Sequence, residues 1–288
     1  MYDINLGNHS VGAHVRDAAC YVVWSFARAY SPDIMKPHVQ TLANKLVNIS
    51  LFDREVNCRR AASATFQEAV GRQGTFPHGI EILTEADYFT LSNRVNAYLN
   101  VSCFVGQYEE YLESMLNYLA FVQLKHWEPA MRQLAAQSLA VLSVFNPPLV
   151  VEKILPKLID SCFSKALTVR HGAIIGVSEI IIGLSGNSVV HKKQVLEKAF
   201  KTLSLKERNL IKEETDNQKQ FAALYDEISG KNTLGESMPA GSEIRNRVKS
   251  LLAEIENAKL LKGKGGEIMR QGVCHLIHSL SQAKIEFE

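Results

Sequence analysis

The sequence predicts an all-α fold, a right-handed α-solenoid of the HEAT/armadillo type in which helical pairs stack as repeats. Three observations support this prediction. Apolar residues at helical spacing dominate the 288-residue chain, a short arginine-centred motif recurs along it, and successive copies of the motif lie at similar intervals. A period of roughly 40 residues is typical of HEAT and armadillo arrays.

The motif is an apolar or small residue, an arginine, and then small residues shortly afterwards. Its arginines are Arg16, Arg59, Arg132, Arg170 and Arg270, with a weaker copy at Arg94. The successive spacings are 43, 35, 38, 38 and 100 residues, and we interpret the last as two periods plus an insertion. The small residues let a neighbouring helix approach closely, and the arginine can reach an acidic or carbonyl partner at the repeat junction.

Each arginine is expected near the start of an inner helix, because apolar residues follow it at i, i+3 and i+4 spacing. Examples are Ala18, Ala19, Val22, Val23 and Phe26 after Arg16, Ala173, Val177, Ile180 and Leu184 after Arg170, and Val273, Leu276, Ile277 and Leu280 after Arg270. Outer helices are expected before several of these, and Pro156 should kink one of them.

The repeats are predicted over 1–186 and 243–288, with an insertion at 187–242 between them. The insertion begins with a charged, helical part around 192–219 and ends in a Ser-, Gly-, Asn- and Pro-containing stretch expected to be mobile. Helices near both ends lack a predicted partner, which would leave apolar flanks open. We therefore expect the chain to be a fragment of a longer solenoid.

Composition excludes several classes of function. The chain is 46% hydrophobic and 22% charged, and 32 basic against 30 acidic residues give a net charge of +2 without a basic block, so nucleic acid is not expected as a partner. The most apolar stretch, 173–184, is shorter than the roughly 20 residues of a membrane span. Five widely spaced cysteines without a C-x-x-C pair suit a reducing compartment, the cytoplasm.

No catalytic residue, cofactor site or metal site is predicted. The glycines at 263–266 precede a helix, but the phosphate-binding loop G-x-x-x-x-G-K-[ST] and its preceding strand are missing. His275 and His278 lie one helical turn apart and could share a metal, yet no third ligand has matching spacing. An ordinary helix face explains them better.

The candidate protein-binding residues are Arg72, Gln73, Phe76 and His78, in a turn-rich connector expected at 71–79. Its glycines and proline give a shaped turn, in which Phe76 is an apolar anchor and the others make polar contacts. Two alternatives stay open. Phe76 could instead pack on the next helical pair, and Arg72 could be an arginine finger for a GTPase or an ordinary capping arginine.

Three blocks of the sequence, at 9–30, 52–79 and 265–274, closely resemble the tubulin-folding cofactor D family, also called tubulin-specific chaperone D. The resemblance implies a large cytosolic HEAT-repeat protein of the microtubule cytoskeleton, which receives β-tubulin. With other tubulin-folding cofactors and an Arf-like GTPase, it would assemble and dismantle αβ-tubulin heterodimers. With cofactors C and E it would stimulate GTP hydrolysis by tubulin, but the catalytic arginine is expected in cofactor C, so none is assigned to this chain.

Two hypotheses follow for the function. The leading one is a non-catalytic chaperone scaffold that binds β-tubulin. The alternative is a HEAT-repeat scaffold of another kind, such as a transport receptor or a phosphatase scaffold, which would have the same fold. An enzyme in its own right has no supporting residues.

Overall fold

The computed structural model describes residues 3–6, 9–204, 208–209, 216–263 and 265–287. These residues are helical almost throughout, which confirms the all-α repeat fold. The strands found among them form one antiparallel hairpin, β1 (Ile4–Leu6) and β2 (His9–Val11). The chain forms two compact units, which are described separately: unit 1 comprises Met1–Met115 and Leu196–Glu214, and unit 2 comprises Leu116–Val195 and Thr215–Glu288.

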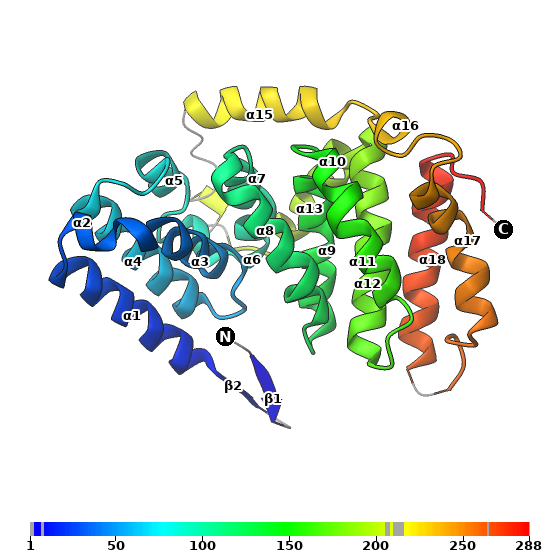
Figure 1. Cartoon of the computed structure of the whole chain (residues 1–288), viewed down its shortest axis with the longest axis horizontal. Coiled ribbons are helices and arrows are strands. Elements are labelled where there is room, and N and C mark those ends of the chain that lie inside the picture. Colours follow the sequence, from blue (N-terminus) through cyan, green and yellow to red (C-terminus); the bar gives the residue numbers. More distant parts are fainter. Residues whose placement is uncertain (1–2, 7–8, 205–207, 210–215, 264, 288) are drawn as a thin grey trace. The chain divides into compact units, whose positions relative to one another are not determined.

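Unit 1 is built around α4 (Val56–Gln73), which packs against α1 (Ala13–Ala29) on one side and α3 (Val39–Phe52) on another (Figure 1). The remaining helices are shorter. They are α2 (Pro32–Met35), α5 (Gly79–Glu85), α6 (Arg94–Asn96), a π-helical turn (Ala97–Val101) and α7 (Ser102–Gly106). Helix α8 (Glu109–Phe121) contributes residues to both units.

Unit 2 has a layer of three neighbouring helices, α9 (Pro129–Ser143), α12 (Leu167–Ile182) and α18 (Gly266–Gln282), with α12 in the middle (Figure 1). A second layer contains α11 (Leu155–Ser161), which packs on α12, and α17 (Glu243–Asn257), which contacts α11. The distortion expected at Pro156 takes the form of a π-helical turn, Val150–Ile154, between α10 (Pro147–Leu149) and α11.

The repeat register inferred from the arginines is confirmed. Arg16, Arg59, Arg132 and Arg170 are each the fourth residue of their helices, α1, α4, α9 and α12, and Arg270 is the fifth residue of α18. Within each unit these helices pack on one another as neighbours, α1 with α4 and α12 with both α9 and α18. The weaker copy differs, because Arg94 is the first residue of α6.

Three of the arginines make the same backbone contact. The Nη1 group of Arg59, Arg132 and Arg170 donates to the carbonyls of the residues five and six positions earlier. The acceptors are Arg54 and Asp53 for Arg59 (3.0 and 2.9 Å), Trp127 and His126 for Arg132 (2.9 and 2.7 Å), and Lys165 and Ser164 for Arg170 (3.0 and 3.5 Å). Each arginine therefore ties the first turn of its helix to the loop that enters it, which confirms the expected carbonyl partner.

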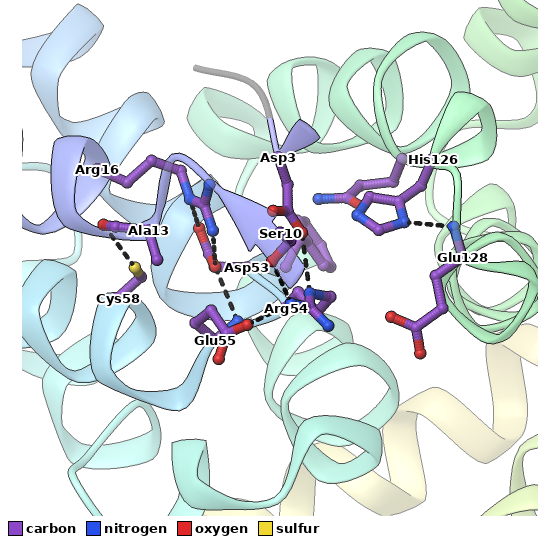
Figure 2. A network of polar contacts seen from close by, with 12 residues as sticks. Asp3, Ser10, Ala13, Arg16, Asp53, Arg54, Glu55, Cys58, His126 and Glu128 are labelled. Carbon is purple, nitrogen blue, oxygen red and sulfur yellow. Dashed lines mark hydrogen bonds and ion pairs between the residues drawn. The ribbon is translucent and has the colours of Figure 1, made fainter. Parts of the chain in front are cut away.

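Arg16 uses an acidic partner instead (Figure 2). Its Nε and Nη2 donate to the two carboxylate oxygens of Asp53, at 2.5 and 3.0 Å, and both side chains are buried. Burial by itself lowers the pKa of Arg16, but hydrogen bonds and attraction to Asp53 outweigh it, so the pKa is raised. Arg54, which follows Asp53 in the chain, donates to Asp3 and Ser10 at 2.9 and 2.5 Å. These bonds hold the β-hairpin against the turn between α3 and α4.

Close helix approach depends on the residue two positions after the arginine. At Gly172, a Cβ atom would lie 1.7 Å from the carbonyl oxygen of Leu124, so no other residue fits without moving the backbone. At the equivalent Gly272, a Cβ atom would meet its nearest neighbour, His171, at an ordinary 3.5 Å. Thus the expected role for small residues is confirmed at Gly172 but not at Gly272.

The stretch predicted as an insertion contains more ordered structure than expected. It forms α13 (Ser188–Lys201), α15 (Asp216–Ser229) and α16 (Leu234–Ser237), while part of the predicted charged helix, 205–207 and 210–215, lies outside the described residues.

The middle of the 229–242 segment is packed on the rest of unit 2, and the mobility expected for this segment stays a prediction. Leu234 is 3% exposed and Met238 is fully buried, and the Thr233 N–H donates to the Leu184 carbonyl at 3.0 Å. The segment is polar overall, so its composition did not indicate that Leu234 and Met238 are buried. Burial of each apolar side chain favours packing of the segment on the protein.

One described helical stretch, Leu167–Lys201, is long and apolar enough to cross a membrane, with a mean hydropathy of 1.7. However, 72% of its most apolar window is buried inside the protein. Gly186, with φ of 81°, also interrupts regular helix geometry within it. Such burial is typical of the central helix of a packed layer, which matches the position of α12.

Candidate protein-binding surface

The structure places the four predicted binding residues at the end of α4 and just beyond it. Helix α4 continues through Arg72 and Gln73 and ends at Gly74, which has a left-handed φ of 62°. The connector is therefore shorter than predicted, because it comprises 74–78 rather than 71–79. His78 follows with φ of 49°, immediately before α5.

Two of the four residues, Phe76 and Gln73, are buried inside unit 1. Phe76, which the sequence suggested to be exposed, is 6% exposed, and its ring lies edge-on to that of Phe66 at 5.4 Å between centroids. Gln73 is also buried, and its amide donates to the carbonyls of Ala27 and Tyr30 at 3.0 and 3.2 Å. These contacts favour the packing alternative for Phe76.

The other two residues stay accessible but lie in different surroundings. Arg72 forms an ion pair with Glu68 one helical turn earlier. The His78 ring stacks on Tyr108 at 3.9 Å, and its Nε2 lies 3.6 Å from a carboxylate oxygen of Glu110. The interface predicted at this connector stays a prediction. Of its four residues, Arg72 and His78 are the ones that are exposed to solvent.

A larger apolar surface lies on α1. Its exposed large side chains are Val15 (64%), Tyr21 (67%), Val22 (48%), Phe26 (45%) and Tyr30 (46%). The Tyr21 and Trp24 rings stack at 5.7 Å, and the Phe26 and Tyr30 rings meet edge to face at 5.6 Å. The stripe that the sequence predicted on α1 is therefore largely open to solvent.

The same motif positions in α4 show what kind of contact this face of α1 can make. Aligned on their arginines, Val15, Val22, Phe26 and Tyr30 of α1 correspond to Cys58, Thr65, Ala69 and Gln73 of α4. The four α4 residues are 1 to 4% exposed. Three of them bond to α1 carbonyls, as when the Thr65 hydroxyl donates to Cys20 at 3.0 Å. The same face is thus a helix-docking face in α4 and is open to solvent in α1.

Charged groups lie on the opposite side of α1, near its carboxyl-terminal end. The Arg28 guanidinium lies 4.6 Å from the centre of the Trp24 ring and 3.4 Å from the Glu68 carboxylate. Glu68 also pairs with Arg72, so an Arg–Glu–Arg row links α1 to the last turn of α4.

We name this feature the α1 surface, which comprises Val15, Val22, Phe26 and Tyr30, because these residues share one face of the helix. Aromatic side chains are among the types that most often dominate binding energy at protein interfaces. An exposed apolar face of this kind can hold a helix or an apolar segment of another protein. It offers no nucleophile or paired acid and base for catalysis.

The sequence features considered for other chemistry have structural roles. Gly265, with φ of 86°, precedes α18 as its N-cap, while Lys264 lies outside the described residues. His275 pairs with Glu179, not with His278. Across the described ranges, no group of three or more His, Cys, Asp or Glu residues is arranged to hold a metal ion.

Comparisons with known proteins show which proteins this chain is similar to. The family model described as "Tubulin-specific chaperone D-like, ARM repeats" matches residues 1–80, which contain α1, α4 and the connector. Tubulin-specific chaperone D of Dictyostelium discoideum is 36% identical over 282 residues, 97% of this chain and 16% of that protein. Tubulin-folding cofactor D of Schizosaccharomyces pombe is 31% identical over 182 residues, 63% of this chain and 16% of that protein.

The chain thus spans about a sixth of the length of these curated relatives. No solved structure gives a significant match to it.

Proposed function

We propose that this chain, which belongs to the tubulin-specific chaperone D family, is part of a non-catalytic scaffold in tubulin folding that binds β-tubulin through the α1 surface. The observation that carries the proposal is the open face of α1. The equivalent face of α4 is covered by a helix, whereas on α1 four large apolar side chains remain 45 to 64% exposed at the same register. Exposed apolar patches of this kind mark protein interaction sites.

The wider role follows from the family. The scaffold would act in the cytoplasm, together with cofactors C and E and an Arf-like GTPase, to assemble and disassemble αβ-tubulin heterodimers. It would support GTP hydrolysis by tubulin within such an assembly without contributing a catalytic residue. The names of the relatives support the tubulin-folding role, and the partners are part of the proposal.

A capture assay with purified β-tubulin tests the proposal. The immobilised chain is compared with Phe26→Ala on the α1 surface and with Tyr88→Ala, which removes another exposed aromatic residue of unit 1 (56% exposed). We expect Phe26→Ala to weaken capture by roughly 2 kcal/mol, about 30-fold, and Tyr88→Ala to leave it unchanged. Both variants should melt as the parent does, since neither side chain is buried.

Equal capture by all three proteins would remove the α1 surface from the proposal. If the parent chain does not retain β-tubulin, the chaperone role itself fails for this segment. A Ran-type GTPase and a phosphatase catalytic subunit, assayed in parallel, represent the alternative scaffolds, and selective retention of either would favour that alternative.

A further inference from the structure

The segment that joins α1 to α2 contains a serine with no role in the packing described so far. Pro32 begins α2, and a proline disfavours helical geometry in the residue before it. Ser31 is accordingly extended, with φ of −69° and ψ of 157°, and Tyr30 is extended as well, with φ of −111° and ψ of 146°. The chain therefore leaves helix geometry at these two residues and presents Ser31 on an extended backbone.

The segment around Ser31 is accessible. Every residue from 28 to 34 is exposed to solvent. The Ser31 side chain does not cap α2, so its hydroxyl is not bound to the first turn of that helix. The N–H groups of Ile34 and Met35 donate to the Ser31 carbonyl at 3.1 and 3.2 Å. A single helical turn of this length has little stability of its own, so an enzyme can open it at small cost.

The sequence at this position carries a motif for a modifying enzyme. The chain contains eight prolines, and Pro32 is the one that follows a serine or threonine. Proline-directed kinases phosphorylate a serine or threonine placed directly before proline, since proline has no backbone N–H that would need an acceptor in the enzyme. A motif of two residues is frequent by chance. At Ser31, however, it coincides with an exposed, extended backbone and a hydroxyl that caps no helix.

Ser31 lies directly beside the α1 surface. Tyr30, the last residue of that surface, is 46% exposed, and its ring meets that of Phe26 edge to face at 5.6 Å. The position of this residue is fixed by α4, because the Gln73 amide donates to the Tyr30 carbonyl at 3.2 Å. Consecutive Cα atoms are about 3.8 Å apart, so a group added to Ser31 stays next to the edge of the α1 surface.

A phosphate at Ser31 would change the charge of this edge. The charged residues among 28–34 are Arg28 and Asp33, so the segment is neutral at pH 7. A phosphoserine adds roughly −1.5 to −2 of charge at this pH. Arg28 is already paired with Glu68 and does not provide a free counter-charge. A partner that covers Tyr30 would have to displace water from the phosphate, and desolvation of such a charge opposes binding.

We propose that Ser31 is a phosphorylation site for a proline-directed serine kinase and that the phosphate weakens binding at the α1 surface. The second part rests on the proposed function. In the reaction, Oγ of Ser31 attacks the γ-phosphorus of ATP, the bond from that phosphorus to the bridging oxygen breaks, and ADP leaves. The hydroxyl proton passes to a base of the kinase. The products are phosphoserine and ADP.

Phosphorylation of the full chain in vitro tests the first part. The chain is incubated with ATP and a purified proline-directed kinase of the mitogen-activated class, and the products are analysed by intact and tandem mass spectrometry. We expect one phosphoryl group on Ser31 and none in Ser31→Ala. Pro32→Ala, which keeps the hydroxyl and removes the directing residue, should be modified about tenfold more slowly, whereas the equally exposed change Asp33→Ala should leave the rate unchanged. No incorporation, phosphate at other residues only, or an equal rate in Pro32→Ala would overturn the site.

Capture of purified β-tubulin tests the second part. The phosphorylated chain is compared with the unmodified chain and with the same sample after treatment with a phosphatase. We expect the phosphate to weaken capture about tenfold and its removal to restore capture, whereas kinase-treated Ser31→Ala should capture as the parent does. Equal capture with and without the phosphate would overturn this part. If the unmodified chain does not retain β-tubulin, the proposed function fails and the regulation fails with it, while the mass measurement still decides whether Ser31 is modified.

Discussion

The repeat arginines fulfil one role in two electrostatic environments. Arg16 is buried against the Asp53 carboxylate, whereas Arg59 is 2% exposed and bonds to four backbone carbonyls. Burial lowers the pKa of Arg59 to about 10, which leaves it charged at neutral pH. Neutral carbonyls are therefore sufficient to hold a buried guanidinium, provided that several converge on it.

The number of carbonyls each arginine bonds should set the cost of its removal. Arg59→Met leaves four carbonyls, of Asp53, Arg54, Leu91 and Ser92, without this donor, and we expect a loss of about 3 kcal/mol in the free energy of unfolding. Arg170→Met removes two bonds from a less buried side chain and should cost about 1 kcal/mol. Urea denaturation measures both. A similar loss for the two variants would contradict the proposed role of the carbonyls.

His171 should make stability depend on pH. Its folded-state pKa of about 4 lies below the ordinary value of 6.5, so between these values the unfolded chain binds more protons than the folded one. Stability is fully present above about pH 6.5 and is lost as the pH falls toward 4, by roughly 3 kcal/mol. His171→Gln keeps an acceptor for Arg132 and removes this titration. Denaturation at pH 7 and pH 4.5 should show a smaller pH effect in the variant, and an equal effect would refute the assignment.

At the scale of elements, the distance between neighbouring segments depends on how much space the side chains at their contact occupy. A Cβ atom at Gly172 of α12 would overlap the Leu124 carbonyl, whereas a Cβ atom at Gly272 of α18 would make ordinary contacts. Glycine is therefore required for steric reasons at this motif position in α12, whereas the same position in α18 has space for a side chain.

This contrast gives opposite expected effects for one substitution. Gly172→Ala should lower the free energy of unfolding by about 3 kcal/mol, because its Cβ overlaps a backbone oxygen. Gly272→Ala should raise it by up to about 1 kcal/mol, since alanine favours the helix and finds space. Thermal melting of the two variants decides the matter, and a stabilised Gly172→Ala would be inconsistent with the packing of α12.

The connector after α4 makes a separate prediction about Phe76. Because its ring is buried against Phe66, Phe76→Ala should cost about 3 kcal/mol or more in stability and leave β-tubulin capture per folded molecule unchanged. Phe26→Ala, which truncates an exposed ring, provides the control for stability. Weakened capture by Phe76→Ala without a loss of stability would restore the interface interpretation.

Periodicity predicted the arginine-bearing helices well, because spacing of apolar residues directly reflects which face is buried. It could not decide whether Phe76 and Leu234 are buried, because each lies in a short polar stretch and its burial depends on residues outside that stretch. The α1 surface carried a signal in the aligned motif copies. At equivalent positions α4 has Cys, Thr, Ala and Gln, whereas α1 has Val, Val, Phe and Tyr. The cavity between α9, α12 and α18 carried no such signal, since its lining comes from three separate segments of the sequence.

At the scale of the whole molecule, the two units contribute different surfaces. Unit 1 has an apolar, aromatic face at a register that its neighbouring helix uses for docking. Unit 2 has a polar cavity with a buried negative charge. A scaffold that presents distinct surfaces on successive repeats can hold chemically different segments of its partners, as repeat proteins commonly do. The matched part of this chain covers 16% of the length of each of these relatives.

Site-specific photocrosslinking most directly tests the central claim, that the α1 surface contacts β-tubulin. A photoreactive amino acid is introduced at Val15 on α1 or, in a separate preparation, at Tyr88, since both side chains are more than half exposed in unit 1. Each protein is irradiated with purified β-tubulin, and the crosslinked products are identified by mass spectrometry. We predict a β-tubulin adduct from the Val15 position and little or none from Tyr88. Adducts from Tyr88 but not from Val15 would contradict the account.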